Sequence, residues 1–81
     1  MRGYTRAQII RATGKSRGSL YDLELRGIIP DPPRNEKGWV IYQEPQLHAL
    51  INHYQRRGIP APEKLIELLE ALEVSSDDEM D

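Results

Sequence analysis

The sequence predicts a mainly α-helical domain of about four helices with a short two-stranded β-hairpin. Its 81 residues allow one modest hydrophobic core. Leu and Ile are the main apolar residues, and they recur at helical spacing between Gly and Pro breaks. One Pro-rich stretch with the β-prone run "WVIY" interrupts that pattern. Residues 1–74 are therefore expected to form one domain.

The first two helices are expected on either side of a glycine break. Thr5 is a suitable N-cap for the first helix, and Gly14 breaks the chain after it. Ser16 is a suitable N-cap for the second, over residues 16–26. Gly27 follows as a residue that readily takes the left-handed conformation at a helix end.

A hairpin and two further helices are expected next. Four prolines and the turn signal "NEKG" predict a hairpin over residues 32–42. An amphipathic helix follows, with apolar residues at i, i+3, i+4 and i+7: Leu47, Leu50, Ile51 and Tyr54. The last helix has a wide apolar face over residues 65–72, expected to pack inside its own domain. The acidic tail, residues 75–81, is expected to be disordered.

Charge is segregated along the chain. The formal net charge is −2, but residues 1–60 carry ten Lys or Arg against five Asp or Glu, a net +5. Residues 61–81 carry one Lys against eight acidic residues, a net −7. The first part can therefore meet a polyanion through a local basic patch, whereas the acidic end cannot.

The run Gly14-Lys15-Ser16 matches the end of a phosphate-binding loop, but the residues before it do not fit such a loop. Such a loop needs a second Gly five residues earlier and a preceding strand, whereas position 9 is Ile within a predicted helix. The remaining pattern is helix, turn, helix and then hairpin, that is, a winged helix-turn-helix. The second helix of such a unit can lie in the DNA major groove.

Other functional classes find little support in the sequence. There is no cysteine, and His48 and His53 are five residues apart, which places them on different faces of a helix. We therefore expect no enzyme, no metal and no other cofactor. No stretch approaches the roughly 20 apolar residues of a membrane span, and the N-terminus lacks a signal peptide core. A cytoplasmic protein with no membrane partner is expected.

The ordered set of motifs resembles the DNA-binding domain of the MerR family of transcription regulators, over about residues 4–74. The matching positions are Tyr4, Thr5, Gly14, Ser16, Leu20, Glu24, Gly27, Ile28, Gly38, Trp39, Tyr42 and the run "RRGIPAPEKLIELL". The family's pattern has Arg, a Tyr pair and a wing Arg where this chain has Tyr21, Asp22, Leu23 and Val40. The long dimerising helix and the effector domain of that family have no counterpart, so no small-molecule effector is expected.

The resemblance implies sequence-specific binding of double-stranded DNA by a bacterial or phage transcription regulator associated with the nucleoid. Residues 16–26 then lie in the major groove as the recognition helix, and the wing, residues 32–42, lies on the backbone or in the minor groove. The candidate DNA-binding residues are Lys15, Ser16, Arg17, Ser19, Tyr21, Arg34 and Lys37. A lone recognition helix buries little surface, so we expect a monomer that associates cooperatively on DNA.

Each candidate also has a plainer interpretation. Ser16 can serve as a helix cap instead of a phosphate donor, and Tyr21 can pack in the core. The wing cations can simply keep a hairpin soluble. Trp39 is expected to be a packing anchor between wing and helices. Arg56 and Arg57 can bind phosphate, but cations near a helix C-terminus are favoured by the dipole in any case.

Asp22, Glu24 and Val40 leave a second class of function open. The two acids add negative charge to the helix that is expected to face DNA, and Val40 removes a wing cation. The alternatives are an excisionase-like architectural factor, and a MerR-like protein-interaction adaptor or phage packaging subunit without strong DNA binding.

Overall fold

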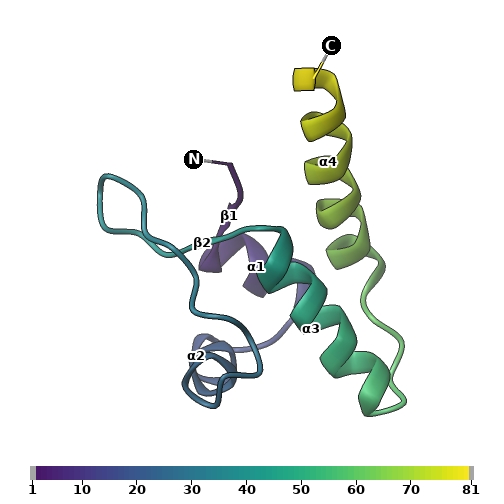
Figure 1. Ribbon diagram of the computed structural model, residues 1–81. Coiled ribbons are helices and arrows are strands. Elements are labelled where there is room, and N and C mark those ends of the chain that lie inside the picture. Colours follow the sequence, from purple (N-terminus) through teal and green to yellow (C-terminus); the bar gives the residue numbers. More distant parts are fainter. Residues whose placement is uncertain (1, 81) are drawn as a thin grey trace.

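The computed structural model describes residues 2–80, with side chains for residues 2–74. Within that range the chain is mainly helical, with four helices and a two-stranded antiparallel sheet, as the sequence predicts (Figure 1). The elements run in the order β1 (Tyr4–Thr5), α1 (Arg6–Thr13), α2 (Arg17–Leu25), β2 (Ile41–Tyr42), α3 (Glu44–Arg56) and α4 (Glu63–Met80). No helix in the described part of the chain is both long and apolar enough to cross a bilayer.

Local hydrogen bonds fix the start of α1 and of α2. The Thr5 hydroxyl accepts a hydrogen bond from the Gln8 backbone N–H, and the Gln8 side chain accepts one from the Thr5 N–H, which completes a capping box. Gly14 then takes the left-handed conformation at φ 73° and ends α1. The Ser16 hydroxyl accepts a hydrogen bond from the Ser19 N–H, so α2 begins at Arg17. The predicted range 16–26 thus includes the two capping residues.

The small sheet differs from the predicted hairpin. Its strands are β1 and β2, paired Tyr4 to Tyr42 and Thr5 to Ile41, so the N-terminal segment supplies a strand that the sequence did not indicate. Within residues 32–42 the two arms share one isolated bridge, Arg34 to Val40. Pro32 and Pro33 have no backbone N–H, so the first arm cannot continue a ladder beyond that bridge. A Cβ on Gly3 would clash with the Tyr42 carbonyl, which explains glycine where the N-terminal segment crosses β2.

The core lies where α4 covers α1 and α3 (Figure 1). Its side chains come from the inward faces of all four helices, from Ile29 after α2, and from residues 40–42 at the end of the wing. The buried apolar side chains are Ile9, Leu20, Leu23, Ile29, Val40, Ile41, Tyr42, Leu47, Leu50, Tyr54, Leu65, Leu69 and Leu72. Most of the apolar face of residues 65–72 is therefore used inside the domain, while Ile66 remains exposed.

The acidic end follows the last helix without a break. The backbone of α4 runs to Met80, and the expected disorder of residues 75–81 stays a prediction. No Gly or Pro interrupts the chain after the Leu-rich turns, and a helix extends at little cost once it has begun. The side chains of residues 75–80 and all of residue 81 lie outside the described residues.

Candidate nucleic-acid interface

The N-terminal turn of α2 is held in a fixed orientation by the preceding loop. The Thr13 hydroxyl donates to the Ile9 carbonyl at 2.8 Å and accepts from the Lys15 N–H at 3.1 Å. These bonds fix the loop that leads into the Ser16 cap. Arg17, the first residue of α2, is exposed as a result, at the end of the helix from which a recognition helix contacts base edges.

The exposed face of α2 carries a cation and an aromatic ring. Tyr21 follows Arg17 by one helical turn and is 51% exposed, so it does not pack in the core. The guanidinium carbon of Arg6 lies 5.7 Å from the centroid of the Tyr21 ring, which is cation–π distance. Ser19 is half-buried and therefore less available than Arg17.

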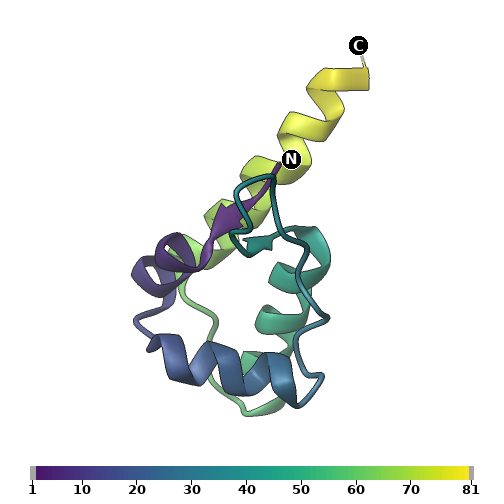
Figure 2. The same ribbon diagram turned by 90° about the vertical axis from the view of Figure 1, so that its left-hand side faces the viewer.

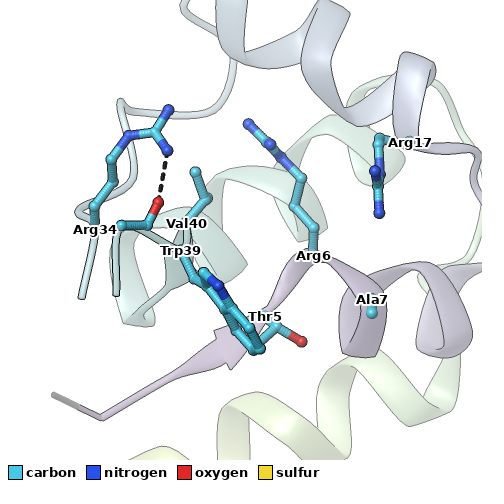
Figure 3. A pocket seen from close by; sticks show the side chains of 8 residues that line it. Thr5, Arg6, Ala7, Arg17, Arg34, Trp39 and Val40 are labelled. Atoms are coloured by element: carbon cyan, nitrogen blue, oxygen red, sulfur yellow. Dashed lines mark hydrogen bonds between the residues drawn. The ribbon is translucent and has the colours of Figure 1, made fainter. Parts of the chain in front are cut away.

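The wing tip is shaped by one asparagine. The Asn35 side-chain oxygen accepts hydrogen bonds from the Lys37 N–H at 2.9 Å and the Trp39 N–H at 3.0 Å. Arg34 donates from Nη1 to the Gly38 carbonyl at 2.8 Å, across the base of the turn (Figure 3). The tip is thus held by local hydrogen bonds and not by burial.

Trp39 does not anchor the wing to the helices, so that prediction is wrong. Its side chain is 58% exposed, and the Lys37 ammonium lies 5.9 Å from the centroid of its ring. Buried Val40 and the β1 to β2 pairing attach the wing to the domain, so the indole is not needed in the core. It faces outward beside the basic side chains of the tip.

A hollow brings the helices and the wing together. It is lined by Thr5 and Ala7 of β1 and α1, Arg17 of α2, and Arg34 and Trp39 of the wing, together with Arg6, Gly38 and Val40 (Figure 3). The guanidinium groups of Arg6, Arg17 and Arg34 therefore come from three different segments. The sequence motifs alone did not place Arg6 in this group.

Arg6 nevertheless forms an ion pair with Glu24. We call the group of Arg6, Glu24 and Tyr42 the Glu24 junction. Arg6 donates from Nε to Glu24 Oε2 at 3.1 Å and from Nη2 to Oε1, and the Tyr42 hydroxyl donates to Oε2. The Glu24 side chain is only 8% exposed. Burial alone raises the pKa of Glu24, but the hydrogen bonds from Arg6 and Tyr42 outweigh it and lower that pKa below its ordinary value.

The two acids of α2 therefore add less negative charge than the sequence suggested. Glu24 points inward, where Arg6 neutralises it. Asp22 forms an exposed i,i+4 ion pair with Arg26, with Asp22 Oδ2 and Arg26 Nε 3.1 Å apart. The exposed face near Arg17 keeps its positive charge.

Five of the seven predicted residues, all except Ser16 and Ser19, fall into two groups. Arg17 and Arg34 line one hollow, and Tyr21 and Lys37 lie beside them on α2 and the wing tip. We call Arg17, Tyr21, Arg34 and Lys37 the basic face. Lys15 is half-buried and lies apart, because its ammonium sits 5.0 Å from the centroid of the Tyr54 ring on α3.

One group of possible metal ligands lies elsewhere. Ligand atoms of Glu44, His48 and Glu73 are within 4.8 Å of one another, on α3 and α4. The sequence prediction paired His48 with no acidic residue. The i,i+4 spacing of Glu44 and His48 does place these two side chains on the same face of a helix. Glu73 is brought there by helix packing. The group is at least partly exposed, as surface charge clusters without a metal often are.

Comparison of the chain with protein-family models, curated proteins and solved structures found no match. The function is therefore argued from the geometry above.

Proposed function

We propose that this protein binds double-stranded DNA, with α2 in the major groove and the wing on the backbone or in the minor groove. The observation that carries the proposal is the basic face. Arg17 and Tyr21 project from the exposed side of α2, while Arg34 and Lys37 extend from the wing. Arginine can pair with guanine edges, and all these groups can contact phosphate.

The electrostatics support this proposal. A DNA-binding face must keep its cations unneutralised, because phosphate contacts supply most of the sequence-independent affinity. The potentially repulsive Glu24 is paired inside the protein, and Asp22 is paired with Arg26. The negative charge of the chain is concentrated in residues 61–81, which follow the helices of the basic face.

The biological role that best fits is a small transcription regulator of the MerR type, acting in the cytoplasm on nucleoid DNA. This part of the proposal rests on the sequence resemblance together with the helix, turn, helix and wing order of the fold. An architectural role of the excisionase kind would use the same surface.

A salt titration with random genomic duplex fragments tests DNA binding. The logarithm of affinity should fall linearly with the logarithm of salt concentration, by about 0.9 for each phosphate contact. The variant Arg17→Gln/Arg34→Gln should bind more weakly and with a smaller slope. Arg11→Gln/Lys64→Gln is the matched control: it removes the same charge from a hollow between α1 and α4. Equal behaviour of the two variants would contradict the proposal.

A protein-interaction role is the second candidate, favoured by exposed apolar side chains. Leu25 is 69% exposed, and Trp39 and Tyr21 are also largely exposed on the same side of the molecule. Exposed apolar groups near polar ones are typical of protein contacts. This candidate predicts that duplex binding is absent at low salt, and that Leu25→Ser leaves the fold intact while abolishing capture of a protein partner.

A further inference from the structure

A mixed group of metal-binding side chains lies between α3 and α4, outside the basic face. It consists of Glu44 and His48 of α3 and Glu73 of α4. One carboxylate oxygen from each glutamate and one imidazole nitrogen all lie within 4.8 Å of one another. The two α3 residues are one helical turn apart, and the third comes from a helix that follows later in the chain. The packing of two helices therefore brings nitrogen and oxygen donors to one place.

The backbone that carries these donors is held by the core. Leu47, directly before His48, and Leu72, directly before Glu73, are both buried in the cluster where α3 and α4 meet. Donors on packed helices are positioned more precisely than donors on loops. The distance between the two sides of the group is therefore set by the fold and not by exposed loops.

An acidic helix surface does not account for this group. The exposed face of α4 carries four glutamates: Glu63, Glu67, Glu70 and Glu73. Within the part of the chain that the structure describes, only the last of these joins a group of three possible metal ligands. The helix dipole favours Glu44 in the first turn of α3, but it does not favour an imidazole and a second carboxylate beside it.

Direct pairing does not account for the group either. An imidazolium beside two carboxylates can form a charge-assisted hydrogen bond with either of them. Within residues 2–74, however, the side chains of His48 and Glu73 form no hydrogen bond or ion pair. The oxygens of Glu44 and Glu73 approach within 4.8 Å, where two carboxylates repel each other. A divalent cation bound by both replaces that repulsion with attraction.

We propose that Glu44, His48 and Glu73 bind one divalent transition-metal ion, best matched by zinc, that ties α4 to α3. Zinc accepts imidazole nitrogen together with carboxylate oxygen at about 2.0–2.2 Å, usually in a tetrahedral arrangement. Ligand atoms around such an ion are about 3.4 Å apart. Because His48 and Glu73 are exposed, small rotations of their side chains close the remaining difference. Three protein ligands leave the fourth position to water.

The site lies apart from the surface proposed to bind DNA. Figure 1 shows α4 on the right of the molecule, with the wing and α2 on the left. Figure 2 shows α4 rising away from α2, which crosses the bottom of the molecule. Metal binding here is therefore independent of DNA binding. A bound ion fastens the C-terminal half of α4 to the start of α3.

Calorimetric titration of the full chain with zinc chloride tests the site. We expect a single ion per chain. His48→Gln and Glu73→Gln should each bind at least about tenfold more weakly, since losing even an indirect partner of a metal ligand costs about 10–100-fold in affinity. The matched controls are His53→Gln and Glu70→Gln, which remove the same types of side chain from the same two helices and should bind like the wild type. Equal affinities in the ligand variants and the controls overturn the proposal.

The two histidines provide a readout on the unmodified protein. Zinc should shift the NMR signals of the His48 ring and leave those of His53 in place, because His53 lies nearer the other end of α3. Zinc should also raise the midpoint of thermal unfolding more in the wild type than in His48→Gln. Equal shifts at both histidines, or an equal rise in both proteins, contradict the site. Calcium or magnesium that binds as tightly as zinc also contradicts it, because these ions take oxygen ligands.

Discussion

The Glu24 junction and the wing tip use charged side chains in opposite ways. At the junction, Arg6 donates to the nearly buried carboxylate of Glu24, which also accepts a hydrogen bond from Tyr42. These hydrogen bonds link α1, α2 and β2. At the wing tip, Arg34 donates a hydrogen bond to the Gly38 carbonyl, and the Lys37 ammonium lies beside the exposed Trp39 ring. The junction uses its charge within the fold, while the charged side chains of the wing tip are exposed.

This difference shows that position near a binding face does not decide what a cation does. Arg6, Arg17 and Arg34 line the same hollow (Figure 3), yet Arg6 is paired with Glu24. A buried pair resists exchange with phosphate, since its partner would be left charged without compensation. Arg17 and Arg34 are exposed and are not part of that buried ion pair. The following predictions test this division.

The largest effect is expected for Glu24→Ala. It leaves the Arg6 guanidinium partly buried without a counter-charge and the Tyr42 hydroxyl without its acceptor. Loss of one partner of a buried pair typically costs about 3–5 kcal/mol. Urea denaturation should therefore show a large fall in the free energy of unfolding. Asp22→Ala, which breaks the exposed pair with Arg26, is the control and should cost less than about 1 kcal/mol.

If the free energy of unfolding fell by a similar amount in both variants, the Glu24 junction would stabilise the fold no more than a surface ion pair does. The comparison between junction and wing would then fail.

The second prediction concerns the pH dependence of stability. Protonation of Glu24 should lower the free energy of unfolding by less than Glu24→Ala does, because the protonated side chain stays in place. The pKa of Glu24 is lowered in the folded state, so its ionised form stabilises the fold. That contribution is present above the ordinary pKa of 4.5 and is lost as pH falls through the folded-state value. Glu24→Gln should remove this part of the pH dependence of unfolding. Identical profiles for both proteins below about pH 5 would count against it.

The third prediction separates base contact from phosphate contact on the basic face. Arg17→Ala should weaken binding to a preferred sequence by about 1–3 kcal/mol and relax the preference at one base pair. Lys37→Ala should weaken binding to all sequences alike and reduce the salt slope by about 1. Selected duplex libraries and fluorescence anisotropy measure both effects. Intact affinity in both variants, with the fold retained, would refute the groove and wing arrangement.

Local features of this chain were readable from sequence, whereas contacts between distant segments were not. The caps at Thr5 and Ser16 and the break at Gly14 follow from short-range rules, and the structure confirms them. The pairing of β1 with β2 joins residues 36 and 38 positions apart, and a two-residue strand leaves no alternating pattern to detect. The Glu24 junction likewise depends on helix packing.

The candidate site divides in the same way. Arg17, Tyr21, Arg34 and Lys37 could be chosen because helix spacing and the hairpin turn expose them. The inward direction of Glu24 and the placement of Lys15 over Tyr54 required the packed helices. Trp39 was misassigned because large aromatic residues are usually buried, and nothing local in "KGWV" indicates that Val40 takes the inward position instead.

The smallest effect on stability is expected for Trp39→Ala, even though tryptophan is the largest side chain in the sequence. Its ring is 58% exposed, and surface substitutions usually change the free energy of unfolding by no more than about 0.5 kcal/mol. The same residue should respond strongly to a ligand, because a duplex on the wing would cover it beside Lys37. As the chain has a single Trp, the fluorescence of the wild-type protein reports this position directly. Acrylamide should quench the free protein efficiently and the duplex-bound protein much less. Unaltered quenching at saturating duplex would place the wing away from the DNA, and a loss of stability near that of Glu24→Ala would show that the indole belongs to the fold after all.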